Sequence, residues 1–214
     1  MKDFRLYAIT GEQFHPGRDL IEVMEEAILG GVDIIQLRDK KSGKDELLRK
    51  AKALRELTRR HGVTFIVNDH IDIALEADAD GVHLGQGDMP LPEARKIVGN
   101  KIIGISTHAI EEALLAERQG ADYIGVGPVF PTKTKEDVVA PVTVSYVREV
   151  AQRIRIPFVA IGGIKLHNVD EVIHAGATRI CAVSEIVGSR DVRGTCQAFL
   201  RKLEQGRKAY GTGD

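Results

Sequence analysis

The sequence has no excess of charge of either sign. Thirty Lys and Arg residues face 31 Asp and Glu residues, which gives a net charge of −1 at pH 7 with neutral histidines. A protein with so little net charge is not drawn as a whole to nucleic acid or to an anionic membrane. We therefore expect neither of these partners, and any phosphate binding has to be local.

Long apolar runs and cysteine motifs are also missing. No stretch approaches the roughly 18 apolar residues of a membrane span, and the start, MKDFRLYAIT, has no apolar segment of the length a signal peptide needs. Cys181 lies in an apolar run and Cys196 in a helical pattern, without CxxC or metal-ligand spacing between them. We expect two neutral thiols in a cytoplasmic protein, rather than a disulfide or zinc site.

No Pro/Ser-rich linker or low-complexity tract divides the chain. Hydrophobic residues make up 43% and charged residues 29% of the sequence, a balance that can bury a sizeable core. We predict a single domain over residues 1–214 with a tail that frays from about residue 205. The oligomeric state is not fixed by these features, which leaves a homo-oligomer open.

A repeating unit dominates the chain. Each unit has a short β-branched apolar run, a polar loop, and a helix-period stretch that closes near a glycine. Most runs are apolar throughout, as strands covered on both faces need to be. There are eight of them, at residues 5–10, 33–38, 64–69, 81–85, 102–107, 123–129, 158–163 and 179–184.

Eight strand–helix units in series predict an α/β protein with a parallel sheet. Such units build a doubly wound open sheet or close into a barrel, and the number eight favours closure. We predict a single-domain (β/α)8 TIM barrel, whose active site lies where the carboxyl ends of the strands meet. Polar residues do follow the predicted strands, among them Gln36, Arg38, Lys40, Asn68, Asp69, Asp88, Ser106, His108, Thr132, Thr134 and Lys135.

Two acids follow neighbouring strands. Asp69 and Asp88 would repel one another without a compensating charge, so they indicate a shared proton or a divalent cation. Mg²⁺ fits best, because it prefers oxygen ligands and commonly joins one or two carboxylates to substrate phosphates. The alternative is that both acids cap the helices that follow them.

Cations and glycines suggest phosphate sites at the same rim. Arg38, Lys40 and Lys135 come from three loops, and a guanidinium fork suits phosphate oxygens, although most surface cations are simply solvated. The Gly162–Ile164 and Val183–Glu185 segments each lead into a helix and could cradle a phosphate. The glycine pair is equally explained by a tight turn.

Three further polar residues admit two interpretations each. Gln36 and Asn68 either orient a ligand or hydrogen-bond one another. His108 is either a proton shuttle or a structural residue at a helix start. We find no Ser/His/Asp arrangement, no nucleophilic Cys motif and no Walker loop.

Taken in order, several segments resemble one family. They are QLRDK, FIVNDHIDIALEADADGVHLGQGDMP, IIGISTH, GADYIGVGPVFPTKTK, IPFVAIGGI and VSE, which together resemble thiamin phosphate synthase (thiamine-phosphate pyrophosphorylase) from about Tyr7 to Ser184. The resemblance implies a transferase that joins 4-amino-2-methyl-5-(diphosphooxymethyl)pyrimidine to thiazole phosphate and releases pyrophosphate. It implies a Mg²⁺-assisted dissociative displacement without a protein nucleophile, which agrees with the missing triad.

The resemblance also implies roles for individual residues. Asp69 and Asp88 would hold Mg²⁺ on the diphosphate. The pyrimidine diphosphate would be bound by Gln36, Arg38, Lys40, Asn68, Ser106 and Lys135, of which Arg38, Ser106 and Lys135 would be catalytic. The thiazole phosphate would be bound by Thr132, Thr134, Gly163, Val183 and Ser184.

One departure and two rival functions stand beside this resemblance. Thr143 occupies a place where the family commonly has glycine, which bears on the flexibility of the preceding loop. A related thiazole tautomerase would use His108 and would not need the paired acids or the TKTK loop. A noncatalytic barrel that binds a thiamin-related phosphate would need only the Gly162–Ile164 and Val183–Glu185 segments.

Overall fold

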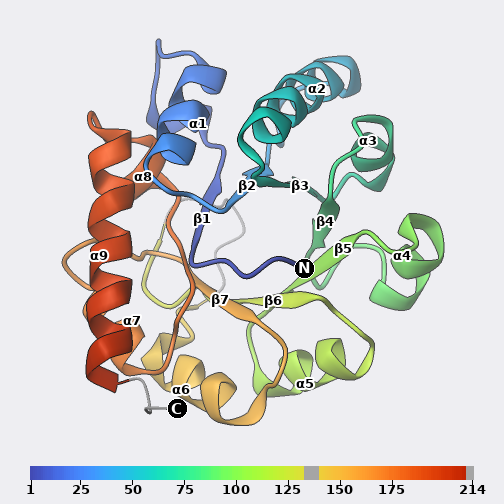
Figure 1. Cartoon of the computed structure of the whole chain (residues 1–214). Coiled ribbons are helices and arrows are strands. Elements are labelled where there is room, and N and C mark those ends of the chain that lie inside the picture. Colours follow the sequence, from blue (N-terminus) through green and yellow to red (C-terminus); the bar gives the residue numbers. More distant parts are fainter. Residues whose placement is uncertain (133–139, 211–214) are drawn as a thin grey trace.

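The computed structural model describes residues 1–132 and 140–210. Eight parallel strands form a closed barrel in chain order, and β1 pairs with β8 to complete the ring (Figure 1). The barrel prediction is therefore confirmed and the open sheet is excluded. The strands are β1 Leu6–Ile9, β2 Ile34–Leu37, β3 Thr64–Asn68, β4 Gly81–Leu84, β5 Ile102–Thr107, β6 Tyr123–Val126, β7 Phe158–Ile161 and β8 Ile180–Cys181.

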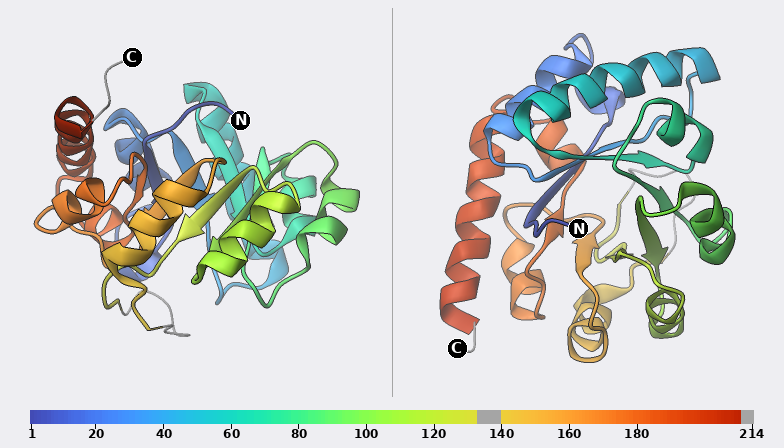
Figure 2. Two further views of the ribbon diagram at one scale, coloured as in Figure 1. Left: turned by 90° about the horizontal axis from the view of Figure 1, so that it is seen from below. Right: turned by 45° about the vertical axis from the view of Figure 1, so that its right-hand side comes forward.

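Helices surround the barrel on its outside (Figures 1 and 2). They are α1 Leu20–Leu29, α2 Lys44–His61, α3 Ile71–Glu76, α4 Leu91–Val98, α5 Ile110–Arg118, α6 Thr143–Arg153, α7 Val169–His174, α8 Ser184–Val187 and α9 Val192–Tyr210, with a short 3-10 helix, η1, at Glu12–Phe14. Helix α9 continues beyond residue 205, where we expected fraying to begin. Among the described residues, no helix combines the length and apolarity required to span a bilayer.

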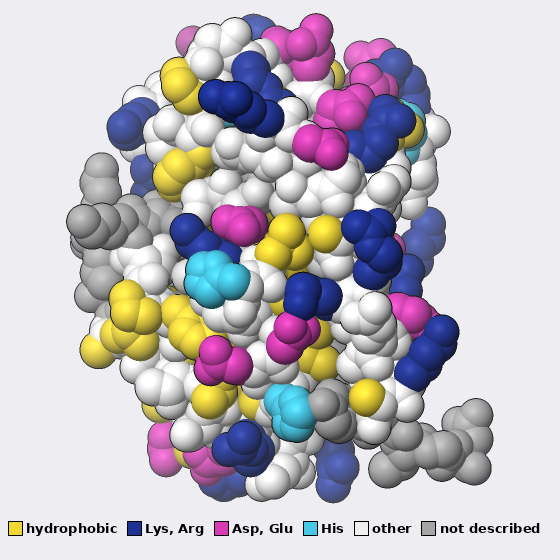
Figure 3. All heavy atoms as spheres, turned by 90° about the vertical axis from the view of Figure 1, so that its left-hand side faces the viewer, with side chains coloured by type: hydrophobic (Ala, Val, Ile, Leu, Met, Phe, Trp, Pro, Cys, Tyr) yellow, Lys and Arg dark blue, Asp and Glu magenta, His cyan; other side chains and the backbone are white. Residues whose placement is uncertain are grey.

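The apolar stripe of α2 shows how the shell is built. Leu47, Ala51, Leu54 and Leu57 recur at helical spacing and are buried against the strands, while charged residues take the opposite side. Figure 3 shows one face of the molecule, on which cationic and anionic side chains are interspersed, as the balanced composition leads one to expect. Both cysteines are buried thiols rather than halves of a disulfide, and burial raises the pKa of the Cys196 thiol to about 12.

A second, smaller core fills the inside of the barrel. Phe4 precedes β1, so it lies at the amino-terminal end of the barrel, where its ring packs edge-on against Tyr7 and Tyr123 at centroid distances of 6.3 and 6.1 Å. The aromatic cluster closes this end. Access to the interior is therefore left to the opposite end, at the carboxyl termini of the strands.

Three aspartates tie neighbouring strands together at the closed end. Asp33, Asp80 and Asp122 stand directly before β2, β4 and β6, and each carboxylate accepts a backbone N–H from the preceding strand, those of Leu6, Phe65 and Ile103, at 2.8 to 3.0 Å. Arg55 also pairs with Asp80, and Arg95 with Asp122. Such charge-assisted bonds stabilise the end of the barrel that carries no site.

Candidate active site

A cavity opens inside the barrel at the carboxyl ends of the strands. Four residues that the sequence singled out line this cavity. Gln36 lies in β2 and Arg38 directly follows that strand, while Asn68 ends β3 and Ser106 lies in β5. The structure thus brings these four side chains together, although they are up to 70 positions apart in the chain. Apolar walls are provided by Ile9, Val159 and Ile161 among others.

A chain of hydrogen bonds crosses the floor of this cavity. The Gln36 amide donates to the Tyr7 hydroxyl at 2.7 Å, and the hydroxyls of Tyr7 and Tyr123 are 2.8 Å apart. His83 lies between the Tyr123 hydroxyl and the Ser106 hydroxyl, at 2.8 Å from each through its two ring nitrogens. Burial raises the pKa of both tyrosines well above the ordinary value, so both hydroxyls stay protonated.

This chain separates the two interpretations of Gln36 and Asn68. Gln36 is bonded to Tyr7, and in the part of the chain that the structure describes the Asn68 side chain forms no hydrogen bond with Gln36. The idea that the two amides satisfy one another is therefore wrong. Asn68 is half-buried and lines the cavity wall.

Sequence inspection missed Tyr7, His83 and Tyr123. Each is a polar or amphipathic side chain inside an apolar strand, at the position that faces the barrel interior. In β4, for example, Val82 and Leu84 pack outward into the shell, while His83 points inward because successive strand residues alternate between faces. A polar side chain at a strand position that faces the barrel interior is the sequence signal that could have identified them.

The backbone at Arg38 is held in place while its side chain lines the cavity. The Thr10 hydroxyl accepts the Arg38 N–H at 2.9 Å and donates to the Arg38 carbonyl at 3.1 Å. Within residues 1–132 and 140–210, the guanidinium has no hydrogen bond or ion pair, and it lines the cavity. A fixed backbone with an unengaged guanidinium suits the binding of an anion.

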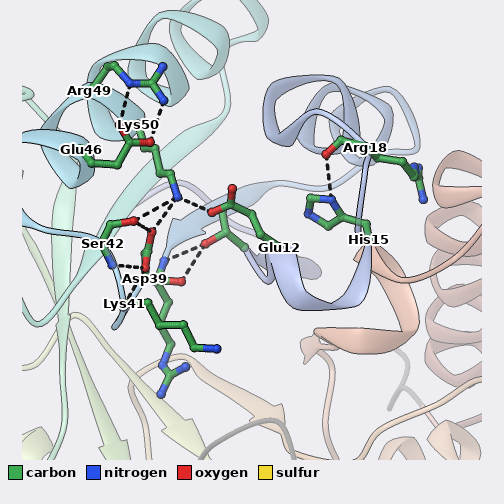
Figure 4. A network of polar contacts seen from close by, with 11 residues as sticks. Glu12, His15, Arg18, Asp39, Lys41, Ser42, Glu46, Arg49 and Lys50 are labelled. Carbon is green, nitrogen blue, oxygen red and sulfur yellow. Dashed lines mark hydrogen bonds and ion pairs between the residues drawn. The ribbon is translucent and has the colours of Figure 1, made fainter.

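A charged network fixes the loop that follows β2 (Figure 4). The Asp39 carboxylate accepts the backbone N–H groups of Lys41 and Ser42 at 2.9 and 3.0 Å. Lys50 from α2 donates to Asp39 at 2.7 Å and also contacts Glu12. Burial opposes the charge on Asp39, but the bonds from Lys50 and Ser42 prevail and hold the pKa of this carboxyl well below its ordinary value.

The two predicted metal acids come together at the rim. The Asp88 carboxylate accepts the Gly85 N–H at 2.6 Å, and Lys40 from the fixed loop pairs with Asp69 at 3.1 Å. The pKa of Asp88 is raised, first by burial and then by the neighbouring carboxyl of Asp69, against the opposing bond from Gly85. Among the described residues, burial and the Asp69 carboxyl together outweigh the groups that favour a charged Asp88.

Neither acid caps a helix, so the capping interpretation is wrong. The residue before α3 is His70 and the residue before α4 is Pro90, and no side chain caps either helix. Asp69 instead has a left-handed backbone, with φ of +62°, which its N–H bond to the His83 carbonyl at 2.9 Å helps to hold. Left-handed backbone is uncommon outside glycine but is tolerated by Asp and Asn.

The glycine pair after β7 makes room for the loop after β6. Gly162 and Gly163 both have positive φ, and a side chain on them would meet Pro128 at 2.4 Å and the Pro131 carbonyl at 2.7 Å. The Phe130 N–H also bonds to the Gly162 carbonyl at 3.0 Å. The tight-turn explanation for these glycines therefore holds, and it places Gly163 directly beside the segment that leads to Thr132.

Five predicted residues follow β6 and β8 in the chain. Val183 and Ser184 stand at the start of α8, and Thr132 is the last residue described before the gap. Thr134 and Lys135 lie outside the described residues. Thr143, noted as a departure from the family, has φ of +66°, so threonine stands in a conformation that glycine adopts without strain.

His108 has a structural contact. Its Nδ1 lies 2.6 Å from the Gly127 carbonyl and donates to it, because a carbonyl can only accept, and its backbone N–H donates to Glu112 at 2.7 Å. The structural interpretation of His108 is thus supported. In the neutral ring Nε2 is the unprotonated nitrogen.

The fold and the site define a (β/α)8-barrel enzyme with cationic and carboxylate groups around a cavity at the carboxyl ends of its strands. A family model for thiamine monophosphate synthase matches residues 6–186. The chain is 69% identical over 206 residues to a thiamine-phosphate synthase of Halalkalibacterium halodurans, covering 96% of this chain and 98% of the relative. It is 66% identical over 206 residues to that of Shouchella clausii, with coverage of 96% and 99%.

A solved structure agrees with these relatives. The thiamine phosphate pyrophosphorylase from Pyrococcus furiosus superimposes with a TM-score of 0.86 at 39% identity, covering 95% of this chain and 96% of that one. The chain belongs to the thiamine monophosphate synthase family. The resemblance noted in the sequence is confirmed.

Proposed function

We propose that this enzyme condenses 4-amino-2-methyl-5-(diphosphooxymethyl)pyrimidine with thiazole phosphate, giving thiamin phosphate and pyrophosphate. The main support is the rim itself, where the Asp69–Asp88 carboxylate pair stands beside Lys40 and above a cavity that Arg38 enters. This arrangement suits a diphosphate brought with a cation. The names of the relatives agree with it.

Mg²⁺ fits the residues present. Asp69 and Asp88 offer only oxygen ligands, and the pKa of Asp88 is raised by burial and, to a smaller extent, by the neighbouring Asp69 carboxyl, whose negative charge a cation would offset. Among the described residues, no group of three or more His, Cys, Asp or Glu could hold a metal, so the proposed ion would have two carboxylate ligands from this part of the chain. When bound, Mg²⁺ would supply positive charge to the diphosphate.

The side chains would act mainly by neutralising and positioning. Arg38, Lys40 and Lys135 would bind the diphosphate oxygens, and Ser106 and Asn68 would hold the pyrimidine end in the cavity. The carbon–oxygen bond to the diphosphate breaks with its electron pair leaving on oxygen, and the aminopyrimidine ring delocalises the positive charge. The thiazole nitrogen then forms the new carbon–nitrogen bond with its lone pair, so no protein nucleophile is needed.

The second substrate would bind on the opposite side of the mouth. Thr132 and Thr134 from the loop after β6, Gly163 after β7, and Val183 and Ser184 at α8 would hold the thiazole phosphate. The contacts of Phe130 with Gly162 and of Pro131 with Gly163, just before Thr132 in the chain, support this assignment.

The test is a turnover assay with both substrates. Purified protein is mixed with the pyrimidine diphosphate, thiazole phosphate and Mg²⁺, and thiamin phosphate is followed after oxidation to its fluorescent thiochrome. Product that requires the metal supports the proposal. Asp69→Asn should abolish it, whereas Asp72→Asn, an exposed acid on α3 that pairs with Lys44, should not.

Other outcomes would point elsewhere. Isomerisation of thiazole carboxylate without condensation would favour the tautomerase, with His108 as the residue to examine. Binding of a phosphate without either activity would favour a noncatalytic barrel. Metal-independent turnover, or full activity in Asp69→Asn, would contradict the proposed role of the acids.

A further inference from the structure

The hydrogen-bonded chain on the cavity floor joins two of the residues proposed to touch substrate. Gln36 stands at one end and Ser106 at the other, with Tyr7, Tyr123 and His83 between them. The five residues come from β2, β1, β6, β4 and β5. None of the three middle residues has a role in the function proposed above.

The barrel makes room for these middle residues. Gly104 on β5 lies against the ring of Tyr123, where an added side chain would meet the ring at 2.1 Å. Gly125 on β6 lies against His83, at 3.4 Å from the site of an added carbon. Both glycines have ordinary strand backbone. Packing against the Tyr123 ring explains the glycine at position 104, whereas an added carbon at position 125 would be in ordinary van der Waals contact with His83.

Counting protons along the chain gives it a direction. Tyr7 accepts from the Gln36 amide, so its single proton is available for the Tyr123 hydroxyl. Tyr123 then donates to Nδ1 of His83, and His83 donates from Nε2 to the Ser106 hydroxyl. In this arrangement each hydroxyl between the ends accepts once and donates once.

The reverse direction leaves one donor unsatisfied. If Ser106 donated to His83, then His83 would donate to Tyr123 and Tyr123 to Tyr7. Tyr7 would accept twice, and in the described part of the chain its own proton would have no further oxygen or nitrogen acceptor. Leaving a buried hydroxyl donor unmatched is costly, so the forward direction is favoured.

We propose that Tyr7, Tyr123 and His83 are positioning residues. They fix a hydrogen-bond donor at one end of the cavity floor and an acceptor at the other. Ser106, which accepts from His83, presents its O–H as a donor. Gln36, whose N–H₂ is held by Tyr7, presents its amide oxygen as an acceptor; this oxygen has no partner among the described residues and is not sealed from the cavity.

These ends match a ligand with a donor at one point and an acceptor at another. An aminopyrimidine that carries a diphosphate is such a ligand, because its amino group can donate to Gln36 while a phosphate or ring acceptor takes the Ser106 proton. This assignment rests on the proposed function. The direction of the chain can nevertheless be measured without any substrate.

The first experiment determines the tautomer of His83 by long-range proton–nitrogen NMR of uniformly labelled protein at about pH 8, where an ordinary imidazole is neutral. The proposal expects the proton on Nε2. His108 supplies an internal reference of the opposite kind, because its Nδ1 donates to the Gly127 carbonyl. The His83 signals are those missing in His83→Gln or, if that variant does not fold, those shifted in Ser106→Ala.

The second experiment tests the effect on substrate. Tyr123→Phe removes the link between Tyr7 and His83 while keeping the ring, and the loss of one hydrogen bond predicts a rise of about fivefold or more in the KM for the pyrimidine diphosphate. The KM for thiazole phosphate should not change. Tyr146→Phe is the control, because this buried hydroxyl bonds Thr107 and the Ala109 carbonyl outside the chain.

The outcomes are distinct. His83 protonated on Nδ1 overturns the proposed direction, and an unchanged pyrimidine KM in Tyr123→Phe, or an equal rise in both KM values, overturns the positioning role. If the wild type shows no turnover, the proposed function fails, but an Nε2–H tautomer still upholds the polarity. A rise in the pyrimidine KM of Tyr146→Phe equal to that of Tyr123→Phe would indicate general loosening of the barrel and would also count against the proposal.

Discussion

Replacing Asp69 separates its electrostatic role from its backbone role. Asp69→Asn removes one charge of the carboxylate pair but keeps a side chain that tolerates the observed φ of +62°. Asp69→Ala removes the same charge and places alanine in a left-handed conformation, which costs about 1–2 kcal/mol. The difference between the two variants therefore measures the backbone strain.

The electrostatic change has two opposing parts. The ion pair with Lys40, whose side chain is 55% exposed, contributes only about 0–1 kcal/mol. Besides burial, repulsion from the Asp69 carboxylate raises the pKa of Asp88. Removing this repulsion stabilises the folded state by a similar amount of free energy. We expect Asp69→Asn without metal to be within about 1 kcal/mol of the wild type, and Asp69→Ala to be less stable than Asp69→Asn by about 1–2 kcal/mol.

The assay is urea denaturation with chelator and with Mg²⁺, alongside turnover. The wild type should gain stability from Mg²⁺, because a ligand that binds only the folded state stabilises it. Neither variant should be stabilised by Mg²⁺ in this way. In both variants kcat should fall at least about 100-fold, which corresponds to a loss on the order of 3 kcal/mol of transition-state stabilisation. Equal stability of the two variants would refute the backbone argument, and an intact response to Mg²⁺ would refute the metal site.

Three further predictions concern single residues. Because the pKa of Asp39 is depressed in the folded state, this carboxylate stabilises the fold fully above the ordinary pKa of an aspartate, and the stabilisation is lost as pH falls below it. The melting temperature of Asp39→Asn should therefore depend less on pH than that of the wild type between about pH 5 and pH 2. Thr143→Gly should relieve a β-branched residue at φ of +66° and raise the free energy of unfolding in urea by up to about 1 kcal/mol; a loss above that would show that the Thr143 bond to Ser145 outweighs the strain. Arg38→Lys keeps the charge but loses the guanidinium fork, and steady-state kinetics should show a rise of about tenfold in the KM for the pyrimidine diphosphate, whereas an unchanged KM would exclude bidentate binding.

The sequence was sufficient for the fold because its signals are local. Every predicted strand overlaps an observed one, and residue pairs such as Gln36 and Arg38 fall at strand ends as expected. Local periodicity and glycine at helix ends are properties of neighbouring residues. They need no knowledge of which strands pair.

The floor of the site was not predictable in the same way. Tyr7, His83 and Tyr123 look like ordinary members of apolar strands, and their contact depends on the register in which β1, β4 and β6 meet across the barrel. The capping interpretation of Asp69 failed for a related reason. Its left-handed backbone is held by a bond to the His83 carbonyl on the adjacent strand, which no local pattern reveals.

The two ends of the barrel divide stability and function between them. At the amino-terminal end, Asp33, Asp80 and Asp122 satisfy backbone donors and Phe4 fills the interior. At the other end, Asp69 has a left-handed backbone, and Thr143 has one where the chain re-enters the shell after the loop. Strained residues persist only where their surroundings hold them, and here the closed end and the helical shell supply that support. A substitution at Asp80 should therefore reduce stability with little change in kcat, whereas Asp69→Asn should lower kcat with little change in stability.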